Sequence, residues 1–339
     1  MTTNHQWLLA ARPSGMITGD EFKWNEAPAP EPGPGQFVVR VVYVSLDPAM
    51  RGWMTDRRSY VPPVGIGEVM RAGGVGQVVA SNHPGYVAGD LVTGTPGWQE
   101  YAVTDGSGMM PMRKLAPGTE LRTSMGVLGG TGLTAYFGVL DVGQPKPGET
   151  VVVSGAAGAT GSVAGQIAKI QGCRVVGLAG SDEKCDWLTR ELGFDAAINY
   201  KTANISKALR DACPKGIDVY FDNVGGEILN TALAQINLGA RLVICGGIST
   251  YNAVEPPPGP SNYMQLVVMR ARMEGFLVSD YASRFGEAIT AMSTWIAEGR
   301  LKSAETVVQG LENAPKAFRM LFEGGNTGKL LVQVAPEPR

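Results

Sequence analysis

The distribution of apolar and polar residues changes near residue 125. Before that point, short valine-rich runs such as FVVRVVYVSL (37–46) and GQVVAS (76–81) alternate with segments rich in proline and glycine. Short strands bounded by turn residues are typical of compact all-β structure. The first part of the chain is therefore predicted to form a β-barrel or sandwich.

From Thr150 onward, apolar strand-like runs alternate with helical stretches. TVVVSGA (150–156), RVVGLAG (174–180) and IDVYFDNVG (217–225) have the composition of buried strands, and the segments between them carry apolar residues at helical spacing. Repeated βαβ units predict a doubly wound parallel sheet with helices on both faces. The expected fold class is α/β, with a separate β-rich part and a final strand in GNTGKLLVQV (325–334).

Composition narrows the classes of partner. The chain has 339 residues, 44% of them hydrophobic, and a formal net charge of −2. This balance gives no electrostatic reason to expect nucleic acid or an anionic membrane. No apolar run reaches the roughly 18 residues of a membrane span, and the first residues lack the pattern of a secretory signal. We therefore expect a cytoplasmic protein.

Cysteine and histidine are scarce and far apart in the sequence. The four cysteines all lie beyond residue 170, and both histidines, His5 and His83, lie before residue 90. A catalytic zinc needs such ligands to converge on one place, so no metal site is expected. The same scarcity argues against a Ser-His-Asp hydrolase.

A glycine-rich turn follows the strand-like run at Thr150. In VVVSGAAGATGSVAG, Gly158 and Gly161 occupy the second and third positions of a dinucleotide-binding motif, and Ala156 stands at the first. Gly158 would let the backbone approach a pyrophosphate, and Gly161 would let the helix pack close to the strand. Such a motif also occurs as a simple packing turn, but the strand before it and the βαβ units after it favour dinucleotide binding.

The next strand-like run indicates which dinucleotide is bound. An enzyme that uses NAD usually places an acid at the tip of this strand, where the present chain has Ala179 and Gly180. Asp182 and Glu183 come later, where acids are ordinary residues of a first helical turn after a Ser181 N-cap. A small tip leaves room for a 2′-phosphate, and Lys184 is near enough to supply charge. NYK (199–201) would close over the same place with a hydroxyl and a second cation; Arg174 is a weaker source of charge.

Taken together, these motifs resemble a known family. SLDPAMRG (45–52), AAGATGSVAGQIAK (156–169), YFDNVGG (220–226), CGGISTYN (245–252) and GNTGKLLV (325–332) stand in the order found in the zinc-independent medium-chain dehydrogenase/reductase superfamily. Within it, the chain is similar to the alkene reductases of the leukotriene B4 12-hydroxydehydrogenase/prostaglandin reductase and curcumin-reductase group.

The resemblance implies a GroES-like catalytic domain and a Rossmann domain that binds NADP(H). Residues 1–127 would form the first part of the catalytic domain, 128–298 the NADP-binding domain, and 299–339 the return to the catalytic domain. The active site would lie in the cleft between the domains. Several members are homodimers, so a homodimer is expected here.

Carried over residue by residue, the resemblance assigns Lys184 and Tyr200 to the 2′-phosphate and Asn223 to the end of the fourth strand. Asn326, on the returning tail, would reach the nicotinamide. The remaining cofactor residues form three runs, which are Ala159, Thr160, Gly161 and Ser162 at the pyrophosphate, Cys245, Gly246, Gly247, Ile248, Ser249, Thr250 and Tyr251 at the adenosine and ribose, and Phe276, Leu277 and Val278 behind the nicotinamide.

Two positions depart from the family pattern. Ala49 stands where tyrosine is frequent, and Val268 replaces the tyrosine that is usually credited with meeting the developing enolate. The remaining candidates for a catalytic hydroxyl are Tyr251, then Tyr60, then Tyr263. Each of them is also a plausible packed aromatic residue with a satisfied hydroxyl.

The expected reaction is reduction of the C=C bond of an α,β-unsaturated aldehyde or ketone by NADPH, with hydride added to the β-carbon. A hydroxyl of Tyr251 or of the nicotinamide ribose would stabilise the enolate, and no metal would be required. Two alternatives remain, namely an NADPH:quinone oxidoreductase and a non-catalytic NADPH-binding protein.

Overall fold

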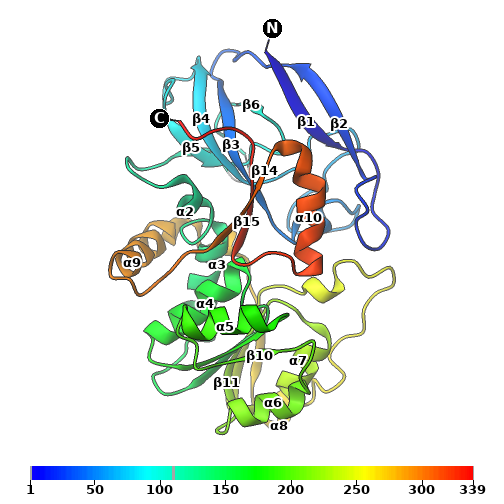
Figure 1. Ribbon diagram of the computed structural model, residues 1–339, viewed down its shortest axis with the longest axis vertical. Coiled ribbons are helices and arrows are strands. Elements are labelled where there is room, and N and C mark those ends of the chain that lie inside the picture. The colour runs from blue at the N-terminus through cyan, green and yellow to red at the C-terminus, as the bar shows by residue number, and fades with distance from the viewer. Residues whose placement is uncertain (1, 109–110, 339) are drawn as a thin grey trace. The chain divides into compact units, whose positions relative to one another are not determined.

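The computed structural model describes residues 2–108 and 111–338, and it divides the chain into two compact units (Figure 1). The first unit comprises Met1–Met125 and Glu305–Arg339, and the second comprises Gly126–Ala304. The tail of the chain thus returns to the unit in which the chain begins. The predicted combination of a β-rich part with an α/β part is confirmed.

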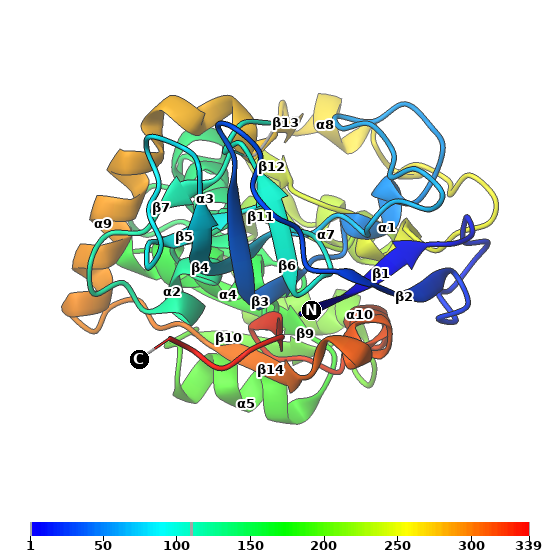
Figure 2. The same cartoon turned by 90° about the horizontal axis from the view of Figure 1, so that it is seen from above.

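The first unit is built around one mixed sheet and a two-stranded ribbon (Figure 2). The sheet has the order β14-β15-β3-β4-β5-β7, with β6 also paired to β3, while β1 pairs with β2. The elements of this unit are β1 (Thr3–Leu9), β2 (Phe22–Pro28), β3 (Phe37–Leu46), α1 (Met50–Trp53), β4 (Gly74–Ser81), β5 (Leu91–Gly94), β6 (Tyr101–Thr104), β7 (Arg113–Lys114), α2 (Leu121–Met125), β14 (Glu305–Gln309), the 3-10 turn η4 (Leu311–Asn313), α10 (Ala314–Glu323) and β15 (Lys329–Gln333).

The returning tail is integral to the first unit. Strand β15 runs antiparallel to β3, with Leu330 opposite Leu46, and α10 buries Phe318 against Trp98. The ammonium of Lys329, which is 2% exposed, lies 2.5 Å from a carboxylate oxygen of Asp47. An ion pair between positions so far apart in the sequence joins the two ends of the chain inside one core.

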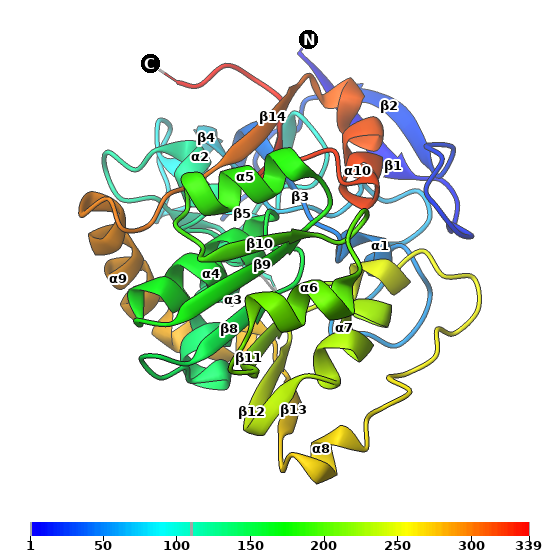
Figure 3. The same cartoon turned by 60° about the horizontal axis from the view of Figure 1, so that its bottom comes forward.

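The second unit is a six-stranded parallel sheet in the order β10-β9-β8-β11-β12-β13 (Figure 3). Its strands are β8 (Thr150–Val153), β9 (Arg174–Ala179), β10 (Ala196–Asn199), β11 (Ile217–Asp222), β12 (Ile236–Ile244) and β13 (Arg272–Gly275). Its helices are α3 (Gly130–Phe137), the π-helix η1 (Gly138–Gly143), α4 (Ala159–Ile170), α5 (Asp182–Arg190), α6 (Ile205–Ala212), α7 (Gly226–Leu233), the 3-10 turn η2 (Ile248–Thr250), α8 (Gln265–Val268), the 3-10 turn η3 (Val278–Arg284) and α9 (Phe285–Ala297).

Alternate residues of the central strands enter two separate cores. Val151 and Val153 of β8 pack with α3, α4 and α9 on one face, whereas Val152 packs with α6 and α7 on the other. Both faces of β8 are therefore buried, which explains why its sequence is a continuous apolar run. The predicted parallel sheet with helices on both faces is confirmed.

Across residues 2–108 and 111–338, the helices are all too short or too polar to cross a membrane.

Candidate functional site

The site is built where the winding of the parallel sheet reverses. From β8 the chain proceeds outward through β9 and β10, and then crosses to the other side of β8 to form β11, β12 and β13. Ligands of wound sheets bind outside the carboxyl ends of the strands at such a switch point. Here the carboxyl ends of β8 and β11 carry the glycine turn and Asn223.

The glycine turn brings the first turn of α4 close to the end of β8. Gly155 has a φ of +57°, a backbone conformation that favours glycine. A Cβ atom on Gly161 would lie 2.4 Å from the carbonyl oxygen of Gly155 and 2.9 Å from the Cα of Ala156, so the helix could not pack here with a larger residue. Gly158 occupies the N-cap and has no side chain to cover the helix end, which leaves the positive end of α4 accessible to an anion.

Asn223 is bonded directly to the end of β8. Its backbone N–H donates to the hydroxyl of Ser154 at 2.8 Å, and its side-chain amide donates to the Ser154 carbonyl at 2.7 Å. The predicted site residue on β11 and the start of the glycine turn are thus held together by two hydrogen bonds.

Beneath Asn223, a buried carboxylate joins the ends of β8 and β11 to the turn that follows β11. One oxygen of Asp222, which is 1% exposed, accepts hydrogen bonds from the hydroxyls of Ser154 and Tyr220 and from the N–H groups of Val224 and Gly225. Among the described residues its other oxygen has no hydrogen-bond partner. Burial, and then the Asp222 carboxylate, raise the pKa of Tyr220 well above its ordinary value. A buried network of this kind rigidifies the segments that it joins.

The loop after β12 is bonded to the same strand end. The N–H groups of Cys245 and Gly246 donate to the carbonyl of Asp222, and that of Ile248 donates to the carbonyl of Asn223. Burial and the Asp222 carboxylate raise the pKa of the Cys245 thiol to about 12, so this thiol is not a nucleophile at neutral pH. At the end of the loop, the Tyr251 hydroxyl accepts a hydrogen bond of 3.2 Å from the N–H of Gly247.

The tip of β9 forms a second cluster in the same unit. A Cβ atom on Gly180 would lie 2.8 Å from the hydroxyl oxygen of Tyr200, so this hydroxyl occupies the place into which a side chain at the tip would extend. Ser181 is the N-cap of α5, as predicted, and its hydroxyl accepts a hydrogen bond from the N–H of Lys184. Burial, and then the nearby Lys201, lower the pKa of the Lys184 ammonium.

The remaining predicted residues lie in both units. Phe276, Leu277 and Val278 follow β13 in the second unit, and the ring of Phe276 packs against Gly138. Asn326 lies in the first unit, is 9% exposed and donates a 2.9 Å hydrogen bond to the carbonyl of Gly328. The structure thus groups the predicted cofactor residues of 159–162, Asn223 and 245–251 around one switch point, with Lys184 and Tyr200 at the β9 tip.

Tyr60, the second candidate for a catalytic hydroxyl, lies in the first unit and is 52% exposed. Its hydroxyl accepts a 3.1 Å hydrogen bond from the indole of Trp53. Desolvation of the phenol raises its pKa above the ordinary value, and the Asp47 carboxylate acts in the same direction. The Tyr60 phenol therefore stays protonated throughout the physiological range.

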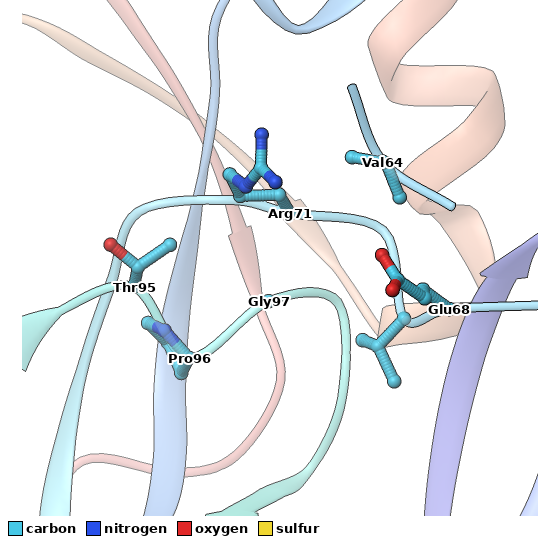
Figure 4. A pocket seen from close by; sticks show the side chains of 7 residues that line it. Val64, Glu68, Arg71, Thr95, Pro96 and Gly97 are labelled. Carbon is cyan, nitrogen blue, oxygen red and sulfur yellow. The ribbon is translucent and has the colours of Figure 1, made fainter. Parts of the chain in front are cut away.

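A hollow of about 200 Å³ lies in the first unit (Figure 4). Arg71, Thr95 and Glu68 give it polar groups, and Val64 and Pro96 give it apolar ones. The guanidinium of Arg71 stands 5.8 Å from the ring centre of Trp53, the same residue that binds the Tyr60 hydroxyl. Sequence patterns gave no reason to single out Arg71 or Trp53, because neither belongs to a recognised motif and their contact depends on the folding of a turn-rich segment.

Asp222 was also missed. Its position in YFDNVGG marked the end of a strand, but a carboxylate that is buried and bonded by four donors can be recognised only once the ends of β8 and β11 and the turn after β11 are placed.

Two family models match the chain. The model described as the N-terminal domain of oxidoreductase matches residues 5–112, and the model described as zinc-binding dehydrogenase matches residues 159–294.

Full-length relatives extend the match to nearly the whole chain. YfmJ of Bacillus subtilis, named as an NADP-dependent oxidoreductase, is 48% identical over 341 residues, covering 99% of each chain. The NADPH-dependent curcumin reductase of Escherichia coli is 45% identical, covering 98% of this chain and 97% of the relative. Prostaglandin reductase 1 of Rattus norvegicus is 40% identical, and the match covers 96% of this chain and 98% of the relative.

A solved structure agrees with these relatives. The crystal structure of CurA from Vibrio vulnificus in complex with NADPH has a TM-score of 0.93 and 46% identity, and the match covers 98% of this chain and all of that one.

Proposed function

Since the chain belongs to the curcumin reductase and prostaglandin reductase group of the medium-chain dehydrogenases/reductases, we propose that it reduces the C=C bond of α,β-unsaturated aldehydes and ketones with NADPH. It is an NADP-dependent oxidoreductase. The observation that carries the narrower proposal is the 45% identity, over nearly the whole length, to a reductase named for NADPH and for curcumin.

The residues at the switch point fit a dinucleotide. Gly161 brings α4 against the end of β8, and Gly158 leaves the helix end without a capping side chain. A pyrophosphate would bind the N–H groups of Ala159–Ser162, because the start of a helix attracts negative charge. Asn223 would lie at the cofactor, and the loop 245–251, which is joined to Asn223 by hydrogen bonds, would line the adenosine and the nicotinamide ribose.

When bound, NADPH supplies the hydride that adds to the β-carbon of the substrate. The chain itself must bind and orient the substrate, exclude water, and place a hydroxyl where negative charge develops on the carbonyl oxygen. Tyr251 and Tyr60 are the proposed residues for that hydroxyl. Tyr251 is placed first because it belongs to the loop that is bonded to Asn223.

Three further features are part of the proposal. The second unit would be the NADP-binding domain, and the first unit, with its returning tail, the catalytic domain. The reaction would proceed without zinc, as the resemblance to the zinc-independent branch implies. The protein would act in the cytoplasm as a homodimer.

Substrate panels test the proposal. The purified protein would be assayed for NADPH oxidation with small and aryl-substituted enones and enals and, in parallel, with simple quinones. Turnover of the enones with loss of the C=C bond is expected. Turnover of quinones alone would replace the proposal by a quinone oxidoreductase. Tight NADPH binding with no turnover in either panel would indicate a non-catalytic protein.

A further inference from the structure

We propose that Lys201 is a second specificity-determining cation of the NADP site, which binds the 2′-phosphate together with Lys184 and the Tyr200 hydroxyl. This inference rests on the proposed use of NADPH and adds a residue to the same site.

Lys201 is held over the strand tip by its neighbours. The N–H of Tyr200 donates to the carbonyl of Ala179 at 3.1 Å, and the N–H of Lys201 donates to the side-chain oxygen of Asn199 at 3.1 Å. A Cβ atom on Gly180 would lie 2.8 Å from the Tyr200 hydroxyl oxygen and 3.4 Å from the Cε of Lys201. The hydroxyl and the lysine stem therefore both lie above the same glycine.

The two lysines repel one another. Lys201 is the second cause, after burial, of the lowered pKa of Lys184, so the two ammonium groups are close enough to interact. Within residues 2–108 and 111–338, Lys201 forms no ion pair with a carboxylate. Two like charges at a small strand tip are relieved by an anion that binds both, and a phosphate monoester carries about two negative charges at neutral pH.

The acids of the same segment are engaged elsewhere. The Asp182 carboxylate accepts a 2.8 Å hydrogen bond from the side-chain amide of Asn199. A hydrogen bond from Ser181 lowers the pKa of the Glu183 carboxyl. Both carboxylates are thus bonded to local neutral donors, whereas the stem of Lys201 lies over Gly180.

Lys207 provides a matched comparison for Lys201. It is an exposed lysine on α6 of the same unit, but its ammonium lies 3.1 Å from a carboxylate oxygen of Asp211. If Lys201 were an ordinary solvated surface residue, removal of its charge would affect cofactor binding no more than removal of the charge of Lys207.

The experiment measures the dissociation constants of NADPH and NADH for the full-length protein and for Lys201→Met, Lys201→Arg, Lys184→Met and Lys207→Met. The methionine variants remove the charge and keep the length of the side chain. For Lys201→Met, NADPH binding is expected to weaken about five- to tenfold, as for loss of one exposed charge-assisted contact, with NADH binding unchanged. Lys201→Arg should retain the preference for NADPH. The difference in NADPH dissociation constant between Lys201→Met and the wild type should shrink in 0.5 M KCl, because exposed charges are screened.

An unchanged ratio of NADPH to NADH affinity in Lys201→Met, with a lowered ratio in Lys184→Met, would overturn the inference. A fall in the ratio for Lys207→Met as large as that for Lys201→Met would also overturn it, because the effect would then be one of overall charge. Binding needs no substrate, so the proposed reductase activity is tested separately. Failure to reduce any enone would leave the result for Lys201 standing, and enone reduction would survive a negative result for Lys201.

Discussion

Substitution of Gly161 tests the close approach on which the dinucleotide site depends. In Gly161→Ala, the new Cβ would stand 2.4 Å from the carbonyl oxygen of Gly155 and 2.9 Å from the Cα of Ala156. Both neighbours are backbone atoms, which cannot swing aside as a long side chain can. The start of α4 or the glycine turn must therefore move by several tenths of an ångström.

The expected cost follows from this clash. Overpacking of a well-packed site costs about 1–3 kcal/mol, and contact with backbone atoms places Gly161→Ala toward the upper end. The higher helix propensity of alanine relative to glycine offsets less than about 1 kcal/mol of this loss in stability. We expect a net loss of about 2 kcal/mol, or roughly 4–8 °C in the melting temperature of a unit of this size.

Two glycines serve as controls. A Cβ atom on Gly130, in α3, would meet none of the described atoms within 4 Å, so Gly130→Ala should leave the melting temperature unchanged or slightly raised. A Cβ atom on Gly158 would lie 3.2 Å from the Gly155 carbonyl oxygen, so Gly158→Ala should cost little stability. Its methyl group would stand where the pyrophosphate is proposed to approach, and NADPH binding should weaken about tenfold, or 1.4 kcal/mol.

Differential scanning calorimetry, with and without NADPH, separates these effects. Gly161→Ala should have a lower melting temperature than the wild type, and NADPH should raise that temperature by less. Gly158→Ala should have the melting temperature of the wild type without cofactor, but NADPH should again raise it by less. If Gly161→Ala melts within a degree of the wild type, the close approach of α4 to β8 does not constrain this position, and the reasoning is refuted.

Three further predictions follow from charges and hydroxyls elsewhere. Asp47→Asn leaves the Lys329 ammonium buried without its carboxylate and should lower the free energy of unfolding, measured by urea titration, by about 3–5 kcal/mol. Asp211→Asn breaks the exposed pair with Lys207 and should lower the free energy of unfolding by less than about 1 kcal/mol. Equal losses in the two variants would contradict the argument that burial makes the first ion pair matter more. Burial raises the pKa of the Cys173 and Cys213 thiols to about 11 from an ordinary value of 9.0. Their contribution to stability is therefore complete below pH 9 and is lost as the pH rises toward 11. The urea midpoint of the wild type should fall between pH 8 and pH 10, and that of Cys213→Ala should fall less over the same interval. Tyr251→Phe should lower kcat for an enone by roughly a hundredfold, as for loss of a proton donor, and Tyr60→Phe should lower it less; a full kcat in Tyr251→Phe would remove that residue from the reaction.

Much of the second unit could be predicted from the sequence because its signals are local. The apolar run at β8 and the glycine turn lie within a few residues of one another. Ser181 lies two residues after the end of β9 and caps the helix that follows. The parallel sheet followed from the repetition of such units.

The contacts that the sequence did not reveal are those between distant segments. The Lys329–Asp47 ion pair joins residues at opposite ends of the chain, and the four bonds to Asp222 require β8, β11 and the turn after β11 to be in place. By contrast, the sequence predicted that Lys201 would lie near Lys184, and the pairing of β10 with β9 brings Tyr200 and Lys201 to the β9 tip. Patterns of hydrophobicity define which elements form, but they carry no information on which polar side chains meet across them.

The central claim is that the protein uses NADPH to reduce the C=C bond of an enone. The most direct measurement is the reduction of an α,β-unsaturated ketone with NADPH that carries deuterium at C4 of the nicotinamide, followed by NMR of the product. The account predicts a saturated ketone with deuterium on the β-carbon and the carbonyl group intact. An allylic alcohol with deuterium on the former carbonyl carbon, or recovery of the unreacted enone while NADPH remains bound, would contradict it.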